Sequence, residues 1–145
     1  MAKLHTYVNF AGNTEEAFNY YKDVFGGEFL SVVRFRDMPI EGVDIPEADQ
    51  DKIMHIGLSI GDDSILMGTD SLESLGQKLV QGNNMYISVA PSTKDEADRI
   101  FNALAQGGEV EMPIADQMWG DYYGSLKDKF GLPWMVNYSP PKTEG

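Results

Sequence analysis

The chain has 145 residues, of which 42% are hydrophobic and 23% charged, a composition typical of one globular domain or of two small halves that share a core. Its 23 acidic and 11 basic side chains give a net charge of −12, which would repel a phosphate backbone or an anionic membrane surface, so neither nucleic acid nor membrane is expected as a partner. No apolar run approaches the ~20 residues of a membrane helix, and the absence of cysteine excludes disulfides, thiolate metal sites and a cysteine nucleophile.

The chain begins with a strand pattern that leads directly into a helix pattern. Residues 4–11 alternate with a period of two, which is typical of a strand whose two faces meet different environments. One face carries Thr6, Val8 and Phe10, and the other carries His5, Tyr7 and Asn9. The first residues show no apolar signal segment, so a cytoplasmic location is expected.

An amphipathic helix is expected to follow this strand. Asn13 occupies an N-cap position with Glu16 three residues later, a capping-box arrangement. Gly26 and Gly27 are expected to end the helix, since glycine adopts the left-handed conformation at a helix C-terminus without strain. The apolar stripe of this helix is Ala17, Tyr20, Tyr21, Val24 and Phe25.

Three more strands complete the first half of the sequence. Residues 28–36 are rich in β-branched and aromatic side chains, and residues 52–61 and 65–69 form a hairpin pattern. The acidic segment 37–51, between the first two of these strands, is predicted to be a long loop. Arg34 and Arg36 are predicted to pair with the acids of residues 41–51, the alternative being that they bind an anionic ligand. This half therefore has the order β-α-β-β-β, and residues 70–82 are the natural linker to the second half.

The second half repeats the same order. The matched positions are Tyr7 and Tyr86, Glu16 and Glu96, and Gly26 and Gly107, at offsets of 79, 80 and 81 residues. Met85, Ile87 and Val89 are predicted to be the buried face of the repeated first strand. The stripe of the repeated helix is Ala97, Ile100, Phe101 and Leu104, and strands near 109–117, 119–127 and 132–138 follow. A repeat of this length indicates a duplicated supersecondary unit.

We therefore expect an α+β fold in a single domain of residues 1–145, made of repeat module 1 (3–70) and repeat module 2 (83–139). Each βαβββ module forms a curved mixed sheet with its helix on the outer face. The opposite faces would be lined by His5, Tyr7, Asn9, Asn84, Tyr86 and Ser88. These polar side chains either enclose a cavity for a small ligand or form a solvated surface.

Four stretches carry a resemblance to a known family. They are residues 13–27, the pair Met54-His55, residues 65–67 with Asp70, and above all residues 119–138, WGDYYGSLKDKFGLPWMVNY. The chain resembles the vicinal oxygen chelate superfamily, which includes glyoxalase I, extradiol dioxygenases and the bleomycin and fosfomycin resistance proteins. Within it, the chain is most similar to the PhnB-like branch. The resemblance implies the paired βαβββ fold and a homodimer whose partner helps to close the cavity.

Members of this branch have carried the name 3-demethylubiquinone 3-methyltransferase. The sequence does not support that activity, because it has no glycine-rich strand–helix turn of the kind that binds S-adenosylmethionine in most methyltransferases. The repeat also argues against the methyltransferase fold.

The resemblance implies four metal-ligand positions, on the first and last strands of each module. Carried over residue by residue, they fall on His5, approximately Met67, Asn84 and approximately Met135. Only His5 is a good ligand, since two thioethers and an amide do not hold the divalent cations of this superfamily. A divalent metal is possible, but most of the ligand set is absent and no cofactor is predicted.

His5 and His55 are the candidate acid–base groups. Each can move a proton near neutral pH, or can be an ordinary hydrogen-bonded strand residue. Small neighbours of His55, Gly57 and Ser59, leave room above the sheet. The expected ligand-binding positions are Tyr7, Asn9, Met67, Asn84, Tyr86 and Met135.

Other residues near the C-terminus are expected to have structural roles and not to bind a ligand. Trp134 is expected to face the helix if Met135 faces the cavity. Three acids in or beside turns are expected to be solvated: Asp116, Asp121 and Asp128.

Three functions remain open. The first is a PhnB-like protein that binds a small organic metabolite, either without a defined activity or as an enzyme that works without a metal. The second is a metal-dependent lyase or dioxygenase of the vicinal oxygen chelate type. The third is a sequestering protein of the antibiotic-resistance type, which binds its ligand and does no chemistry.

Overall fold

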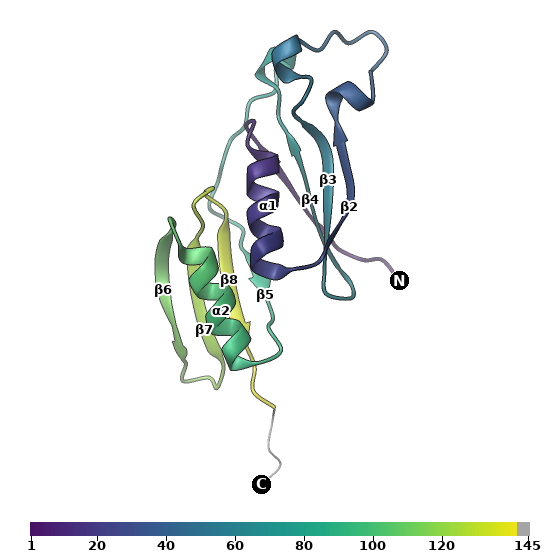
Figure 1. Cartoon of the computed structure of the whole chain (residues 1–145). Helices are drawn as coiled ribbons and strands as arrows, with labels where there is room; N and C mark the ends of the chain where they lie inside the picture. The colour runs from purple at the N-terminus through teal and green to yellow at the C-terminus, as the bar shows by residue number, and fades with distance from the viewer. Residues whose placement is uncertain (142–145) are drawn as a thin grey trace. The chain divides into compact units, whose positions relative to one another are not determined.

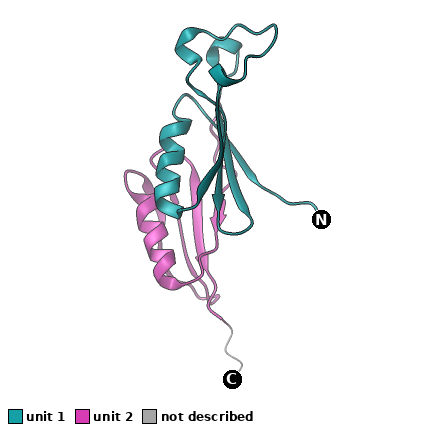
Figure 2. Ribbon diagram, turned by 45° about the vertical axis from the view of Figure 1, so that its right-hand side comes forward, with its two compact units in different colours: residues 1–80 teal, residues 81–145 magenta. Residues whose placement is uncertain are grey.

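The computed structural model describes residues 1–141 and divides into two compact units (Figure 2). The first unit is Met1–Val80, and the second begins at Gln81. The boundary between them falls within the segment predicted as a linker. Each unit contains one α-helix and one four-stranded sheet (Figure 1).

The first unit has the predicted order β-α-β-β-β. Its elements are β1 (Thr6–Phe10), α1 (Thr14–Phe25), β2 (Glu28–Arg34), β3 (Ile53–Ile60) and β4 (Ser64–Asp70). The sheet order is β1-β4-β3-β2, with β1 parallel to β4 and the other neighbours antiparallel. The prediction of a mixed sheet with one covering helix is confirmed.

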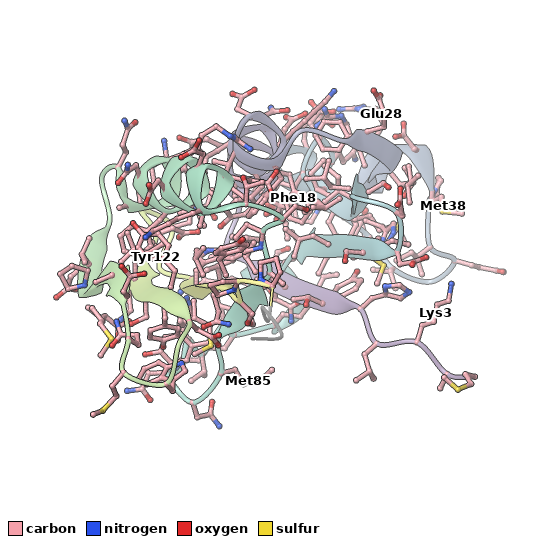
Figure 3. All side chains as sticks on the ribbon, turned by 90° about the horizontal axis from the view of Figure 1, so that it is seen from below. Lys3, Phe18, Glu28, Met38, Met85 and Tyr122 are labelled. Atoms are coloured by element: carbon pink, nitrogen blue, oxygen red, sulfur yellow. The ribbon has the colours of Figure 1, made fainter. Side chains whose placement is uncertain are left out.

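Helix α1 packs closely on its sheet because a glycine lies beneath it. Ala17, Tyr21 and Val24 are buried as predicted, but Phe18 is also buried, while Tyr20 is only half-buried. A Cβ at Gly68 would come within 2.7 Å of the Phe18 ring, so glycine at this position leaves room for the ring on β4. Phe18 is labelled among the side chains between the helices and the strands in Figure 3. The buried stripe is therefore rotated slightly from the one that the sequence indicates.

The segment between β2 and β3 contains two short 3-10 helices, Phe35–Asp37 and Glu47–Asp49. Arg36 forms ion pairs with Glu47 (3.5 Å) and Asp51 (2.8 Å), as predicted, and the hydrogen bond from Arg36 keeps the pKa of Asp51 below its ordinary value. Arg34 was predicted to pair with the same acids, but it forms an ion pair with Glu15 on α1. The prediction was wrong for Arg34 because α1 brings another carboxylate closer.

The second unit repeats the architecture. Its elements are β5 (Ile87–Val89), α2 (Lys94–Ala105), β6 (Glu109–Asp116), β7 (Tyr122–Lys127) and β8 (Pro133–Tyr138). The sheet order is β5-β8-β7-β6, with β5 parallel to β8. A 3-10 helix, Glu73–Leu75, lies in the chain before β5.

Helix α2 has a side-chain N-cap and the buried stripe that the sequence indicates. The Thr93 hydroxyl accepts a hydrogen bond from the Glu96 N–H at 3.0 Å, and the Glu96 carboxylate accepts one from the Ser92 N–H at 2.9 Å. Thr93 is thus the N-cap of the helix, and the Glu96 carboxylate binds the N–H of the residue before the cap. The predicted stripe is buried throughout: Ala97, Ile100, Phe101 and Leu104.

Strand β5 is shorter than predicted. It has three residues, so Met85 lies before the strand and is 76% exposed. The prediction that Met85 belongs to a buried face was wrong, because its period-two pattern extends beyond the residues that pair with β8. Ile87 and Val89 stay on the side of α2 and are half-buried.

The two α-helices have 12 residues each. Within the described residues, no helical segment reaches the length and hydropathy that a membrane-spanning helix requires.

Candidate functional site

The strand register of the first unit brings a set of polar and small residues to the face away from α1. Tyr7 of β1 lies beside Met67 of β4, and Met67 lies beside Gly57 of β3. Gly57 lies beside Ser31 of β2. Four strands thus contribute neighbouring residues to one patch of sheet.

Tyr7 and His55 form a pair on this face. The Tyr7 hydroxyl lies 3.4 Å from Nδ1 of His55, and the two rings are 5.8 Å apart between centroids. Tyr7 is 49% exposed and His55 is half-buried, so both groups are accessible. If the hydroxyl donates to Nδ1, the ring proton lies on Nε2, where it can be donated to a ligand.

Space opens beside this pair because residue 57 has no side chain. A Cβ at Gly57 would lie 3.6 Å from the Ser31 hydroxyl, 3.9 Å from Nε2 of His55 and 3.9 Å from Cγ of Met67. Nε2 of His55, the Ser31 hydroxyl and the Met67 side chain therefore border one small space above the sheet. We call the set Tyr7, Ser31, His55, Gly57 and Met67 the Tyr7–His55 site.

Sequence reasoning identified Tyr7, His55 and Met67 separately but missed Ser31. The β2–β3 pairing shifts register between Phe29 and Ser31, and this irregularity places Ser31 opposite Gly57. A simple alternation through residues 28–36 does not reveal such a shift.

His5 and Asn9 lie outside this group of neighbours. His5 precedes β1 and is exposed, so it is not part of the sheet. Asn9 is also exposed and lies beside Thr69 at the other end of the β1–β4 pairing. Their assigned roles in catalysis and ligand binding stay predictions.

The second unit also has a polar face away from its helix. Met135 lies beside Ser88 there, and the Tyr86 hydroxyl donates a 2.7 Å hydrogen bond to Oε2 of Glu111. This bond raises the pKa of Tyr86, because the neutral phenol donates to a carboxylate that would repel the phenolate. Asn84 was expected on the first strand of this unit, but it lies before β5 and is exposed.

A hollow of about 270 Å³ adjoins the Tyr86–Glu111 pair. Its lining consists of Asn83, Tyr86, Glu109, Glu111, Lys127 and Pro133. The sequence analysis included only Tyr86 from this set. The feature that could have revealed this hollow is a pair of opposite charges on neighbouring strands, since Glu109 of β6 lies beside Lys127 of β7.

The residues at the implied metal positions do not fit a divalent cation. They offer one imidazole, one amide and two thioethers, from His5, Asn84, Met67 and Met135. Thioethers are soft ligands, whereas Zn²⁺, Mn²⁺ and Fe²⁺ prefer imidazole and carboxylate at such sites. Elsewhere in residues 1–141, no three His, Asp or Glu side chains are grouped so that they could hold a metal ion. The donor chemistry therefore gives no basis for a step through a metal.

The motif that carries most of the family resemblance is structural. Asp128 is 3% exposed and accepts hydrogen bonds from the N–H groups of Phe130 and Leu132 and from the indole of Trp134. The expectation that Asp128 is solvated was wrong, because the turn between β7 and β8 folds over its carboxylate. Trp134 is 1% exposed and lies on the same face of β8 as Val136, which is fully buried.

A glycine of this motif, Gly124, is required for packing. A Cβ at Gly124 would lie 2.7 Å from both the Cα of Ile114 and the ring of Phe101. Gly124 therefore allows α2 to lie against β7. Asp121, another acid of the motif, accepts a 3.0 Å hydrogen bond from Asn137.

Two units, each a mixed four-stranded sheet covered by one helix, define a protein of the glyoxalase/bleomycin resistance class. The fold is shared with a glyoxalase/bleomycin resistance protein/dioxygenase family enzyme from Burkholderia phytofirmans, at 20% identity and a TM-score of 0.62 over 93% of this chain and 98% of that one. The chain belongs to the family described as 3-demethylubiquinone-9 3-methyltransferase, whose model matches residues 2–137, and thus to the PhnB-like branch of the vicinal oxygen chelate superfamily.

Relatives match over almost the whole chain. Protein YjdN of Escherichia coli is 31% identical over 141 residues, which cover 92% of this chain and 93% of that protein. A Pseudomonas aeruginosa protein of known structure is 34% identical, with a TM-score of 0.84 over 96% of this chain and 98% of that one. A Bacillus cereus protein described as a putative 3-demethylubiquinone-9 3-methyltransferase, PhnB protein, is 27% identical, with a TM-score of 0.75 over 95% of this chain and 100% of that one.

Proposed function

We propose that this protein binds a small organic molecule at the Tyr7–His55 site and that it does so without the superfamily metal. The observation that carries the proposal is the position of His55: its Nδ1 lies within hydrogen-bond distance of the Tyr7 hydroxyl, and its Nε2 borders the space above Gly57. An imidazole in this position can donate to a ligand oxygen or accept a proton from it near neutral pH.

The borders of the space define the kind of ligand. Met67 offers a flexible apolar surface, and Ser31 offers a hydroxyl that can donate or accept. A ligand with one apolar side and one or two polar oxygens matches this lining. The metal-dependent alternative lacks support from the donor set, and stoichiometric zinc, manganese or iron in elemental analysis of the purified protein would contradict the proposal.

We also propose that the protein acts as a cytoplasmic homodimer. Exposed apolar side chains in the second unit support the dimer: Val110, Met112, Met118 and Trp119. Such groups are typical of protein interfaces. Sedimentation velocity that gives the monomer mass at all concentrations would contradict the dimer, and cell fractionation tests the location.

Two histidine variants test the binding proposal. Native mass spectrometry of protein taken directly from cells identifies a retained ligand, whose affinity is then measured by calorimetry. His55→Ala is expected to weaken binding about tenfold or more, since a hydrogen bond to a ligand contributes roughly 1–2 kcal/mol. His5→Ala is the matched control, because it removes the other histidine from an exposed position. Equal affinities for His55→Ala and the wild type would refute the proposal.

A glycine variant tests the space itself. Gly57→Ala would place a methyl group at ordinary contact distances from Ser31, His55 and Met67, so it should leave the fold intact while reducing the space. We expect weaker binding with an unchanged circular dichroism spectrum. If binding persists in His55→Ala while turnover of the ligand is lost, the protein is an enzyme; if the wild type only binds, it is a sequestering protein.

A further inference from the structure

The second unit contains charged groups that face each other across a hollow without meeting. Glu109 and Lys127 are direct neighbours in the β6–β7 register, and both line the hollow of about 270 Å³. Among the described residues, neither side chain has a hydrogen-bond or ion-pair partner. Opposite charges that are adjacent in a sheet normally pair across the strands, so the space between these two can accept a group that bridges them.

A third charged group is already held in place at this hollow. Glu111 accepts the hydrogen bond from Tyr86 through Oε2, which fixes its carboxylate and leaves Oε1 available. A second hollow of about 420 Å³ also borders Lys127 and shares Asn83 with the first. Lys127 therefore borders two hollows, and only the first of them is lined by carboxylates.

These charges restrict the class of ligand. A simple anion would meet Lys127 but also two carboxylates in a chain of net charge −12. A simple cation would meet the carboxylates but also Lys127. A zwitterion satisfies all three groups, because its negative end can pair with the ammonium while its positive end pairs with the carboxylates.

We propose that this hollow binds a free α-amino acid. Its carboxylate pairs with Lys127, and its ammonium lies between Glu109 and Glu111, which Tyr86 orients. A hollow of about 270 Å³ lies just below the usual range of ligand pockets, roughly 300–1,000 Å³, which suits a ligand as small as an amino acid. This site shares no residue with the Tyr7–His55 site, and its ligand is a zwitterion.

The experiment is a thermal-shift screen of the full-length protein with the standard α-amino acids, followed by calorimetry of the amino acid with the largest shift. At about 100 times Kd, that amino acid is expected to raise Tm by roughly 5–10 °C. Its N-acetyl derivative lacks the ammonium and its amide lacks the carboxylate, so both are expected to bind at least about tenfold more weakly.

Variants then assign the binding to this hollow. Lys127→Met keeps the length of the side chain and removes the charge, and Glu109→Gln removes the opposite charge; each is expected to weaken Kd about tenfold or more. Lys129→Met is the matched control, since Lys129 does not line the hollow, and His55→Ala is expected to keep the wild-type affinity. The proposal is overturned if no amino acid binds, if the amide binds as well as the acid, if Lys127→Met binds normally, or if His55→Ala loses as much affinity.

Discussion

Replacing Asp128 with alanine is expected to destabilise the second unit by roughly 3–5 kcal/mol. The carboxylate accepts hydrogen bonds from the Phe130 N–H at 2.8 Å, the Leu132 N–H at 3.0 Å and the Trp134 indole N–H at 2.8 Å. Alanine leaves these three donors without their acceptor at a position that is 3% exposed. Each buried donor that loses its partner costs about 1–3 kcal/mol, and partial access of water reduces the sum.

The two tryptophans provide a selective measurement of this effect. Both Trp119 and Trp134 belong to the second unit, so the fluorescence change on urea unfolding reports that unit. Asp116→Ala is the matched control, because its ion pair with Lys94 is exposed and such pairs contribute about 0–1 kcal/mol. A loss for Asp128→Ala no larger than the control's would show that the carboxylate does not hold the turn.

The asparagine variant separates the contributions within this network. Asp128→Asn can keep an oxygen toward Phe130 and Leu132, but its NH₂ group then faces the Trp134 indole, and two donors oppose each other. We expect a loss smaller than that of Asp128→Ala, accompanied by a changed environment of the Trp134 indole. A tryptophan emission maximum identical to that of the wild type would contradict this assignment.

Periodicity was sufficient to predict most of the fold. The two helices and the order of elements along each unit follow from apolar spacing, glycine pairs and the repeat, because these patterns reflect which faces are buried. The errors occur where the spacing of apolar residues does not determine where a strand ends or which side chains a helix buries. Met85 continues the strand alternation but lies beyond the three residues of β5, and Phe18 lies just beside the expected stripe of α1.

The candidate site was harder to predict because it depends on strand order and register. Tyr7 and His55 could each be assigned to a polar face, but their approach to 3.4 Å requires that β4 lie between β1 and β3. Ser31 depends on a register shift, and Lys127 depends on its neighbour across the strands. None of these relations has a signature within a single segment of sequence.

Asp128 shows a signal that was present but was misinterpreted. Acids in turns are usually solvated, yet Asp and Asn also accept hydrogen bonds from the backbone two residues later. The bond from the Phe130 N–H has this spacing. The sequence that follows, with Gly131 and Trp134, then folds over the carboxylate. Thus Asp128, Gly131 and Trp134 of the family motif determine how β7 turns into β8.

Asp70 is expected to be as important for the first unit, and its loss should also weaken binding at the Tyr7–His55 site. Its Oδ1 accepts from the N–H groups of Gly12 and Thr14 and from the Thr14 hydroxyl at 2.6 Å, while its Oδ2 accepts from the Ile53 N–H at 2.8 Å. One residue at the end of β4 thus holds the start of α1 and the start of β3. We expect Asp70→Ala to cost roughly 3–5 kcal/mol.

Hydrogen exchange followed by mass spectrometry measures this effect where tryptophan fluorescence does not report it. The amides of Gly12, Thr14 and Ile53 lose their acceptor in Asp70→Ala, so peptides that cover the start of α1 and the start of β3 are expected to exchange faster. Asp63→Ala removes an exposed acid in the same unit, so it is the matched control and should leave these peptides unchanged.

The loss of Asp70 should also lower ligand affinity, because Tyr7 and His55 lie on β1 and β3. Loosening of these strands separates the pair before the sheet unfolds, so affinity should fall even at temperatures where the variant remains folded. Normal protection and normal affinity in Asp70→Ala would show that the sheet holds its register without this carboxylate.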